Sequence, residues 1–311
     1  MRIAARMLGV IFLTSVLALV FGTLGARADE TVTATSFGND KIVSVDLTTN
    51  TVTTIFSPPS PPDSMIFNGP NTIIYTQVVN SQIDIFNTLT STNSVLATGF
   101  AQPRDLVLDP SGTTLVVSDF LSGTIDRVVI ATGVTTVLSH PGGTPDGLAY
   151  DGKGDLFVVI NRDQIVQIDP TTGAVLAKSK VFDGNLDGLT FDTFSGKLWV
   201  ASENGGIFSV TTDLGTVTGF TGPAGTSFDG IEGNGLGSLF LANFGANVYQ
   251  FTIASGTFTS ETAVPGIDDL APIVGGGSGG GPTPAPEPGS WALLVMGLTG
   301  VITFARRRAL V

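Results

Sequence analysis

Apolar residues along this chain gather in short runs of four to six positions, and each run is bounded by Gly, Pro, Asn or Asp. The clearest stretch begins at Pro145 and holds four such runs, at 147–150, 155–160, 164–168 and 174–179. Turn sequences separate them, among them Asp151-Gly152-Lys153-Gly154 and Pro170-Thr171-Thr172-Gly173. Short apolar runs between turn signals predict antiparallel β-strands. The stretch is therefore expected to form a four-stranded sheet.

This four-strand unit recurs along the chain, and each copy opens with a similar short motif. The motifs are Pro62-Asp63-Ser64, Pro103-Arg104-Asp105, Pro145-Asp146-Gly147, Leu186-Asp187-Gly188, Phe228-Asp229-Gly230 and Ile267-Asp268-Asp269. Their second residues lie 39 to 42 positions apart. A β-rich repeat of this length is typical of a propeller blade. Apolar pairs such as Leu156-Phe157 and Leu198-Trp199 fit inner strands that neighbouring blades cover on both faces.

The two ends of the repeat region complement each other. Residues 31–56 contain the last three strands of a unit, whereas residues 268–273 contain only the first strand. The C-terminal strand can complete the N-terminal blade, which closes the ring and removes free sheet edges. We therefore expect an all-β, six-bladed β-propeller of four-stranded blades, spanning 29–274, whose first blade is closed by the C-terminal strand.

Both termini carry patterns that differ from the repeats. Residues 1–28 have a basic start, an apolar stretch and the small-x-small site Ala26-Arg27-Ala28, which predicts a signal peptide removed by signal peptidase. A Gly/Pro linker at 275–285 leads to residues 286–311. There Pro286-Glu287-Pro288 precedes an uncharged apolar run and Arg306-Arg307-Arg308. Positive charge after an apolar segment predicts a transmembrane helix with its C-terminal end in the cytoplasm.

This C-terminal order resembles the PEP-CTERM signal of Gram-negative bacteria that secrete polysaccharide. The resemblance implies sorting by exosortase, a membrane protease that processes the tag. It also implies export across the inner membrane to the cell surface or extracellular matrix, with membrane attachment through the C-terminal helix before processing. Whether the mature protein is anchored or released stays open.

Composition excludes several classes of function. The chain has no cysteine and a single histidine, His140, so thiol chemistry and multi-histidine zinc sites are excluded. Six of the 14 basic residues and one of the 26 acidic residues lie in the terminal segments, which leaves eight basic and 25 acidic residues. A domain with a formal charge of about −17 repels nucleic acid.

Candidate site residues follow from strand direction, because the starts of first strands and the ends of second strands meet on one face of the ring. The first group is Asp63, Arg104, Asp146, Asp187, Asp229 and Asp268, and the second is Gln77, Asp119, Asn161, Glu203 and Asn243. One interpretation is an oxygen cage at the channel mouth for Ca²⁺ or another divalent cation, formed by Asp146, Asn161, Asp187, Glu203 and Asp229. The other is that each side chain fixes its own turn. Arg104 interrupts the acidic series and, with Asp119 and Asn243, is a candidate ligand-binding residue.

The repeats resemble six-bladed propellers of the NHL and gluconolactonase/senescence-marker groups, most clearly at 145–151 and 196–201. The gluconolactonase resemblance implies one divalent cation in the channel and an acidic residue acting as base. Asp187 and Asp229 would match the Asp ligand and the base, and Asn161 an amide ligand. The early glutamate of that family's Glu-Gly-Pro motif is replaced by Pro62-Asp63-Ser64. Two hypotheses result: a binding or matrix protein whose partner is exopolysaccharide or a small ligand, and a divalent-metal-dependent, lactonase-like hydrolase.

Overall fold

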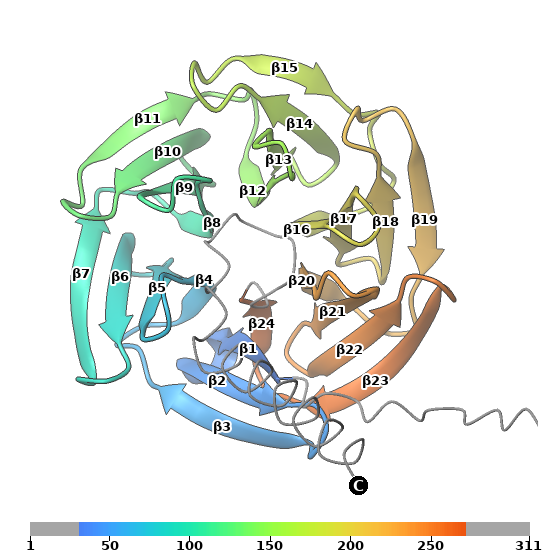
Figure 1. Cartoon of the computed structure of the whole chain (residues 1–311), viewed down its shortest axis with the longest axis horizontal. Helices are drawn as coiled ribbons and strands as arrows, with labels where there is room; N and C mark the ends of the chain where they lie inside the picture. Colours follow the sequence, from blue (N-terminus) through green and yellow to red (C-terminus); the bar gives the residue numbers. More distant parts are fainter. Residues whose placement is uncertain (1–30, 272–311) are drawn as a thin grey trace, which may run out of the picture.

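A computed structural model describes residues 31–271 of the protein. It shows a ring of six four-stranded antiparallel sheets (Figure 1). The prediction of an all-β, six-bladed propeller is confirmed. The predicted signal peptide (1–28), linker (275–285) and sorting signal (286–311) lie outside the described residues. Within 31–271, no helix is long and apolar enough to cross a membrane.

Each blade is numbered in ring order, with its strands A to D given from the centre outward. Blade 1 contains β24 (Ile267–Leu270), β1 (Thr31–Ser36), β2 (Lys41–Asp46) and β3 (Thr51–Phe56), with a 3-10 turn, η1 (Phe37–Asn39). Blade 2 contains β4 (Pro62–Phe67), β5 (Thr72–Gln77), β6 (Gln82–Asn87) and β7 (Thr92–Thr98). Blade 3 contains β8 (Pro103–Leu108), β9 (Thr114–Asp119), β10 (Thr124–Val129) and β11 (Thr135–Ser139).

The second half of the ring repeats this order. Blade 4 contains β12 (Pro145–Tyr150), β13 (Leu156–Ile160), β14 (Gln164–Ile168) and β15 (Val175–Lys178). Blade 5 contains β16 (Leu186–Asp192), β17 (Lys197–Ser202), β18 (Gly206–Val210) and β19 (Val217–Thr221). Blade 6 contains β20 (Phe228–Gly233), β21 (Ser238–Asn243), β22 (Asn247–Thr252) and β23 (Thr257–Ala263).

Blade 1 closes the ring with strands from opposite ends of the described chain. β24 pairs antiparallel with β1, with Ala34 opposite Leu270 and Ser36 opposite Ile267. The backbone N–H of Ala271 then donates to the carbonyl of Thr33 at 2.8 Å. All six blades are therefore complete within residues 31–271, and the expected closure is confirmed.

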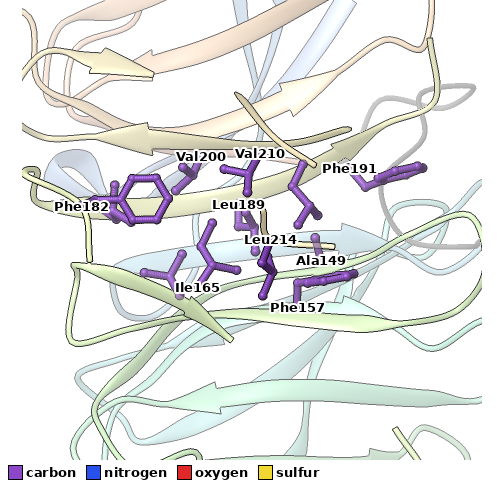
Figure 2. Packing of buried hydrophobic residues seen from close by; sticks show 12 residues of the cluster. Ala149, Phe157, Ile165, Phe182, Leu189, Phe191, Val200, Val210 and Leu214 are labelled. Carbon is purple, nitrogen blue, oxygen red and sulfur yellow. The ribbon is translucent and has the colours of Figure 1, made fainter. Parts of the chain in front are cut away.

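The hydrophobic core lies between the blades. The predicted apolar pairs of strands B are buried, and Leu156, Phe157 and Leu198 are fully shielded from solvent. Figure 2 shows one such cluster, where Phe157 and Ile165 of blade 4 meet Leu189 and Val200 of blade 5. Because each strand B is buried on both faces, it needs the apolar residues on both sides that the sequence displays.

Candidate functional site

A repeated β-bulge places the second residue of every strand A at the centre of the ring. In each blade the register between strands A and B shifts just after the first residue of strand A, as between Pro145 and Leu148. A bulge of this kind redirects a side chain out of the normal alternation. We call the six residues at this position the axial ring: Asp63, Arg104, Asp146, Asp187, Asp229 and Asp268. The turns between strands D and A and those between strands B and C lie around the axial ring on one face of the propeller. We call this the upper face.

One arc of the axial ring consists of carboxyl groups that touch one another. The carboxyl group of Asp268 lies beside those of Asp63 and Asp229, and that of Asp187 lies beside that of Asp229. Two carboxyl groups can hydrogen-bond only if a proton lies between them. Burial, followed by the charges of neighbouring carboxylates, raises the pKa of Asp187 and of Asp268 well above the usual range. Asp187 and Asp268 therefore bind protons more readily than a free aspartate does.

The pKa values of Asp63 and Asp146 are also raised. Burial raises the pKa of Asp63 to about 6, with Asp268 and Arg104 opposing the shift. Burial raises the pKa of Asp146 to about 7, although Arg104 and Arg162 favour its ionised form. The charge of the axial ring thus changes across the physiological pH range.

Arg162, in the B–C turn of blade 4, binds three acidic side chains from two blades. Its Nε lies 3.2 Å from Asp146, its Nη2 lies 2.9 Å from Asp187 and its Nη1 lies 2.8 Å from Glu203. Partial burial opposes the charge of the guanidinium, but Asp187, Asp146 and Glu203 together raise its pKa. Arg162 therefore acts as an internal cation at the edge of the axial ring.

The backbone of this turn is in a conformation that arginine rarely adopts. Asn161 has φ 53° and Arg162 has φ 57°, both in the left-handed region. A left-handed conformation costs a non-glycine residue about 1–2 kcal/mol, and Gly commonly follows Asn in such hairpins. The three ion pairs of Arg162 offset this cost. The sequence interpretation missed Arg162. The signal that could have found it is that few of the eight basic residues of the domain fall in turns of the upper face, and Arg162 is one of them.

Arg104 contributes the second guanidinium of the site. Its Cζ lies 4.6 Å from the centroid of the Phe120 ring, and the Cζ of Arg162 lies 5.9 Å from the same centroid. The Nε of Arg104 is buried and has no hydrogen-bond partner among residues 31–271. Asp146, Asp63 and Asp187 raise the pKa of Arg104, although burial opposes them. The charge of Arg104 is thus balanced by nearby carboxylates that it does not bind directly.

The third residue of strand A differs between the two halves of the ring. In blades 1 to 3 this residue has a side chain, and Ser64 Oγ donates to Asp105 Oδ1 at 2.8 Å. Burial, followed by the charge of Asp105, raises the pKa of Asp269 well above its usual range. Burial raises the pKa of Asp105 to about 6. The sequence interpretation overlooked this partly buried group, Asp105, Ser64 and Asp269, although its residues interrupt the Asp-Gly motif.

In blades 4 to 6 the same position is glycine, because neighbouring backbones approach too closely for a side chain. A Cβ on Gly147 would lie 2.3 Å from the carbonyl oxygen of Asp187, and one on Gly188 would lie 2.7 Å from that of Asp229. These glycines bring strands β12, β16 and β20 together. Their close approach lets Asp146, Asp187 and Asp229 interact across blades.

The predicted residues at the ends of strands B lie on the upper face, but most of them bond their own blade. Asp119 accepts hydrogen bonds from the backbone N–H groups of Ala101 and Gln102. Asn161 accepts one from Thr144, and Asn243 accepts one from Ser227. These contacts fix the D–A turns, so the metal-binding role of Asn161 and the ligand-binding roles of Asp119 and Asn243 stay predictions. Glu203 differs, because it binds Arg162 and accepts a hydrogen bond from Asn185.

Three of the predicted metal-binding residues do converge. Asp187, Glu203 and Asp229 each offer a carboxylate oxygen within 4.8 Å of the others. Carboxylate oxygens suit Ca²⁺ or Mg²⁺. However, Arg162 already binds Asp187 and Glu203, so a metal ion here would compete with its guanidinium. Asp146 accepts a hydrogen bond from Nε of the same guanidinium, whereas Glu203 accepts one from Nη1.

A scan against known protein families finds no family that matches the chain, and a search of curated proteins finds no match. Solved structures do resemble it. One is a nidogen/laminin complex, at 18% identity over 78% of this chain and 97% of that chain, with a TM-score of 0.66. Another is virginiamycin B lyase from Staphylococcus aureus, at 19% identity over 65% of this chain and 69% of that chain, with a TM-score of 0.53. A streptogramin B lyase matches at 16% identity over 65% and 68%, with a TM-score of 0.55. At these identities the likeness establishes the fold alone: this chain is a β-propeller whose structural neighbours include a chain of a nidogen/laminin complex and two lyases.

Proposed function

We propose that this chain is an exported β-propeller that a Gram-negative bacterium sorts to its surface, where it acts as a binding or matrix protein. The ligand site would be the axial ring and the turns around it. The partner would be a hydroxyl-rich molecule, with the sugar units of exopolysaccharide as the first candidate. Export and sorting rest on the terminal sequence patterns, and ligand binding rests on the geometry of the site.

The observation that carries the binding role is Arg104. Its guanidinium lies on Phe120 and its Nε lacks a hydrogen-bond partner among the described residues. A buried donor without a partner costs about 1–3 kcal/mol, and an oxygen-bearing ligand that draws the guanidinium into new hydrogen bonds would recover part of that cost. Asp63 and Asp146 lie near enough to act on the pKa of Arg104. A sugar hydroxyl both donates and accepts, so it can bridge a guanidinium and a carboxyl group.

A binding measurement tests this role. Residues 29–274 would be titrated with fragments of exopolysaccharide from the producing host, and binding followed by calorimetry. Arg104→Met keeps an unbranched apolar side chain but removes the donors, and we expect it to weaken binding about tenfold or more, equivalent to about 1.4 kcal/mol. Arg127→Met, on β10, is the matched control. Equal binding by both variants, or no binding by the parent domain, would contradict the proposal.

Sorting is tested separately from binding. In a host that carries exosortase, intact mass measurement of surface material should show loss of the residues beyond Pro286-Glu287-Pro288. The motivation is the sequence order of this motif, an apolar run and Arg306-Arg307-Arg308. Recovery of the full-length chain from the surface of such a host would refute exosortase processing and leave the ligand site untouched.

The alternative function is a divalent-metal-dependent, lactonase-like hydrolase, and the convergence of Asp187, Glu203 and Asp229 favours it. When bound, the metal would polarise a lactone carbonyl. Elemental analysis of the purified domain and a calcium-dependent rise in melting temperature test the cation, and Asp187→Asn with Asp229→Asn should abolish most of that rise. Arg162→Gln sharpens the test, because removal of a competing guanidinium should strengthen calcium binding. An equal calcium response in the double asparagine variant would exclude this site.

A further inference from the structure

The outer strands of the six blades differ in how well their free edges are protected. Figure 1 shows these strands on the circumference of the ring, where each has one edge without a partner strand. Five of them, β3, β7, β11, β15 and β23, have a register shift against strand C. Two of these five also carry a charge, Lys178 and Glu261. Bulges and charges are the features by which proteins block edge-to-edge pairing.

The outer strand of blade 5 has neither protection. β19 pairs with β18 in an unbroken register from Val217 opposite Val210 to Thr221 opposite Gly206. Its sequence, Val-Thr-Gly-Phe-Thr, contains no charge and no proline. Thr218, Gly219 and Thr221 are exposed. Among the described outer strands, β19 is therefore the one regular, uncharged edge.

The hydrogen bonds on either side of β19 determine which of its backbone groups face outward. Thr211 N–H donates to Thr216 C=O at 3.1 Å, and Gly222 N–H donates to Gly205 C=O at 2.9 Å. Hydrogen-bonded pairs alternate along an antiparallel ladder. Thr218 and Phe220 therefore bond to β18, whereas Val217, Gly219 and Thr221 direct their N–H and C=O groups away from the blade.

The strand is also held in place before any partner arrives. The ring of Phe220 packs against Trp199 with centroids 5.5 Å apart, and against Phe251 with centroids 5.1 Å apart. An edge that is already extended and rigid loses little conformational entropy when a second strand pairs with it.

We propose that β19 is a self-association edge, at which two copies of this chain pair their β19 strands antiparallel about Gly219. The outward groups then match each other, forming about six backbone hydrogen bonds. Val217 lies opposite Thr221 of the second copy, and pairs of β-branched residues are favourable across strands. Gly219 meets its own copy at the two-fold axis, so neither a side chain nor a like charge obstructs the centre. The net acidic charge of the domain opposes association at long range, so pairing strengthens as salt is added.

Cysteine cross-linking tests the pairing and its register. The chain has no cysteine, so Val217→Cys with Thr221→Cys introduces the only two thiols. Four residues along a strand span about 13 Å, which is beyond the roughly 7 Å limit for a disulfide, so any link is intermolecular. We expect a disulfide dimer of residues 29–274 that joins 217 to 221. The control, Ser94→Cys with Thr98→Cys, lies on bulged β7 with both positions exposed. Equal cross-linking of both variants would overturn the proposal.

A non-covalent measurement completes the test. Sedimentation velocity over a range of concentrations should show a reversible dimer of the cysteine-free domain, stronger in about 0.5 M salt than at low ionic strength. Val217→Pro removes an outward N–H but no bond to β18, so we expect the dissociation constant to rise about tenfold or more with an unchanged fold by circular dichroism. Thr221→Lys provides a second variant should the proline disturb the strand. A parent domain that stays monomeric throughout would refute the self-pairing, even if it bound some other extended peptide.

Discussion

Replacement of Arg162 by glutamine tests whether an internal cation holds the acidic site together. The arginine side chain is 23% exposed, and its three partners are 3%, 13% and 29% exposed. Exposed ion pairs contribute up to about 1 kcal/mol, whereas loss of one partner from a buried pair costs about 3–5 kcal/mol. The ion pairs of Arg162 are partly exposed, so their contribution to stability lies between these limits. We therefore expect Arg162→Gln to lower the free energy of unfolding by about 2–4 kcal/mol at pH 8, or the melting temperature by about 5–10 °C.

The loss should shrink at acidic pH. Asp146 has a pKa of about 7 in the folded state, and the pKa of Asp187 is well above its usual range. At pH 5 the carboxyl group of Asp146 is largely protonated, and that of Asp187 binds a proton more readily than a free aspartate, so the guanidinium has less charge to neutralise. Denaturant unfolding followed by circular dichroism at pH 8 and pH 5 gives the comparison, and we expect the loss at pH 5 to be less than half that at pH 8.

Two further variants separate charge from backbone strain. Arg162→Gly removes the same ion pairs but relieves the left-handed conformation at φ 57°, so it should be about 1 kcal/mol less destabilising than Arg162→Gln. Arg127→Gln, on β10, removes a positive charge away from the axial ring and should change stability by less than about 0.5 kcal/mol. An Arg162→Gln loss that is equal at both pH values would refute the reasoning.

Three other outcomes are expected. Because the folded-state pKa values of Asp63 (about 6) and Asp146 (about 7) exceed the value of 3.8 for a free aspartate, the folded state binds more protons between about pH 4 and 7. Stability should then fall as pH rises through that window, and calorimetry showing a rise would contradict these shifts. A chain ending at Val264 lacks β24 and should lose its cooperative melt or aggregate through the opened edge of β1; an unchanged melting curve would disprove the closure. Gly147→Ala should cost about 1–3 kcal/mol by overpacking against a backbone oxygen, and Gly152→Ala, whose Cβ would meet the nearest ring atom at 3.5 Å, should cost less in the same denaturant titration.

Local pattern determined the architecture of this protein. The period of about 41 residues, the alternation of apolar runs with turn residues and the complementary ends predict six four-stranded blades and their closure. Each of these features acts within one repeat or between repeats that are neighbours in sequence. The apolar pairs of strands B also predict burial on both faces, which Leu156 and Phe157 confirm. Such signals survive in a single sequence because packing of each blade depends on its own residues and on an adjacent, similar blade.

The tertiary structure alone decided which polar side chains meet. Asn161 of blade 4 and Glu203 of blade 5 occupy equivalent positions, each directly after the last residue of strand B, yet Asn161 bonds a turn of its own blade while Glu203 binds Arg162. The repeat could not distinguish them, because the difference depends on a turn conformation and on a side chain that reaches from blade 4 to blade 5. The pKa values of Asp63, Asp146, Asp187 and Asp268 are likewise raised by burial and by carboxylates on other blades. Interactions between residues about 40 positions apart are set by the closed ring, and the order of residues within a repeat does not encode them.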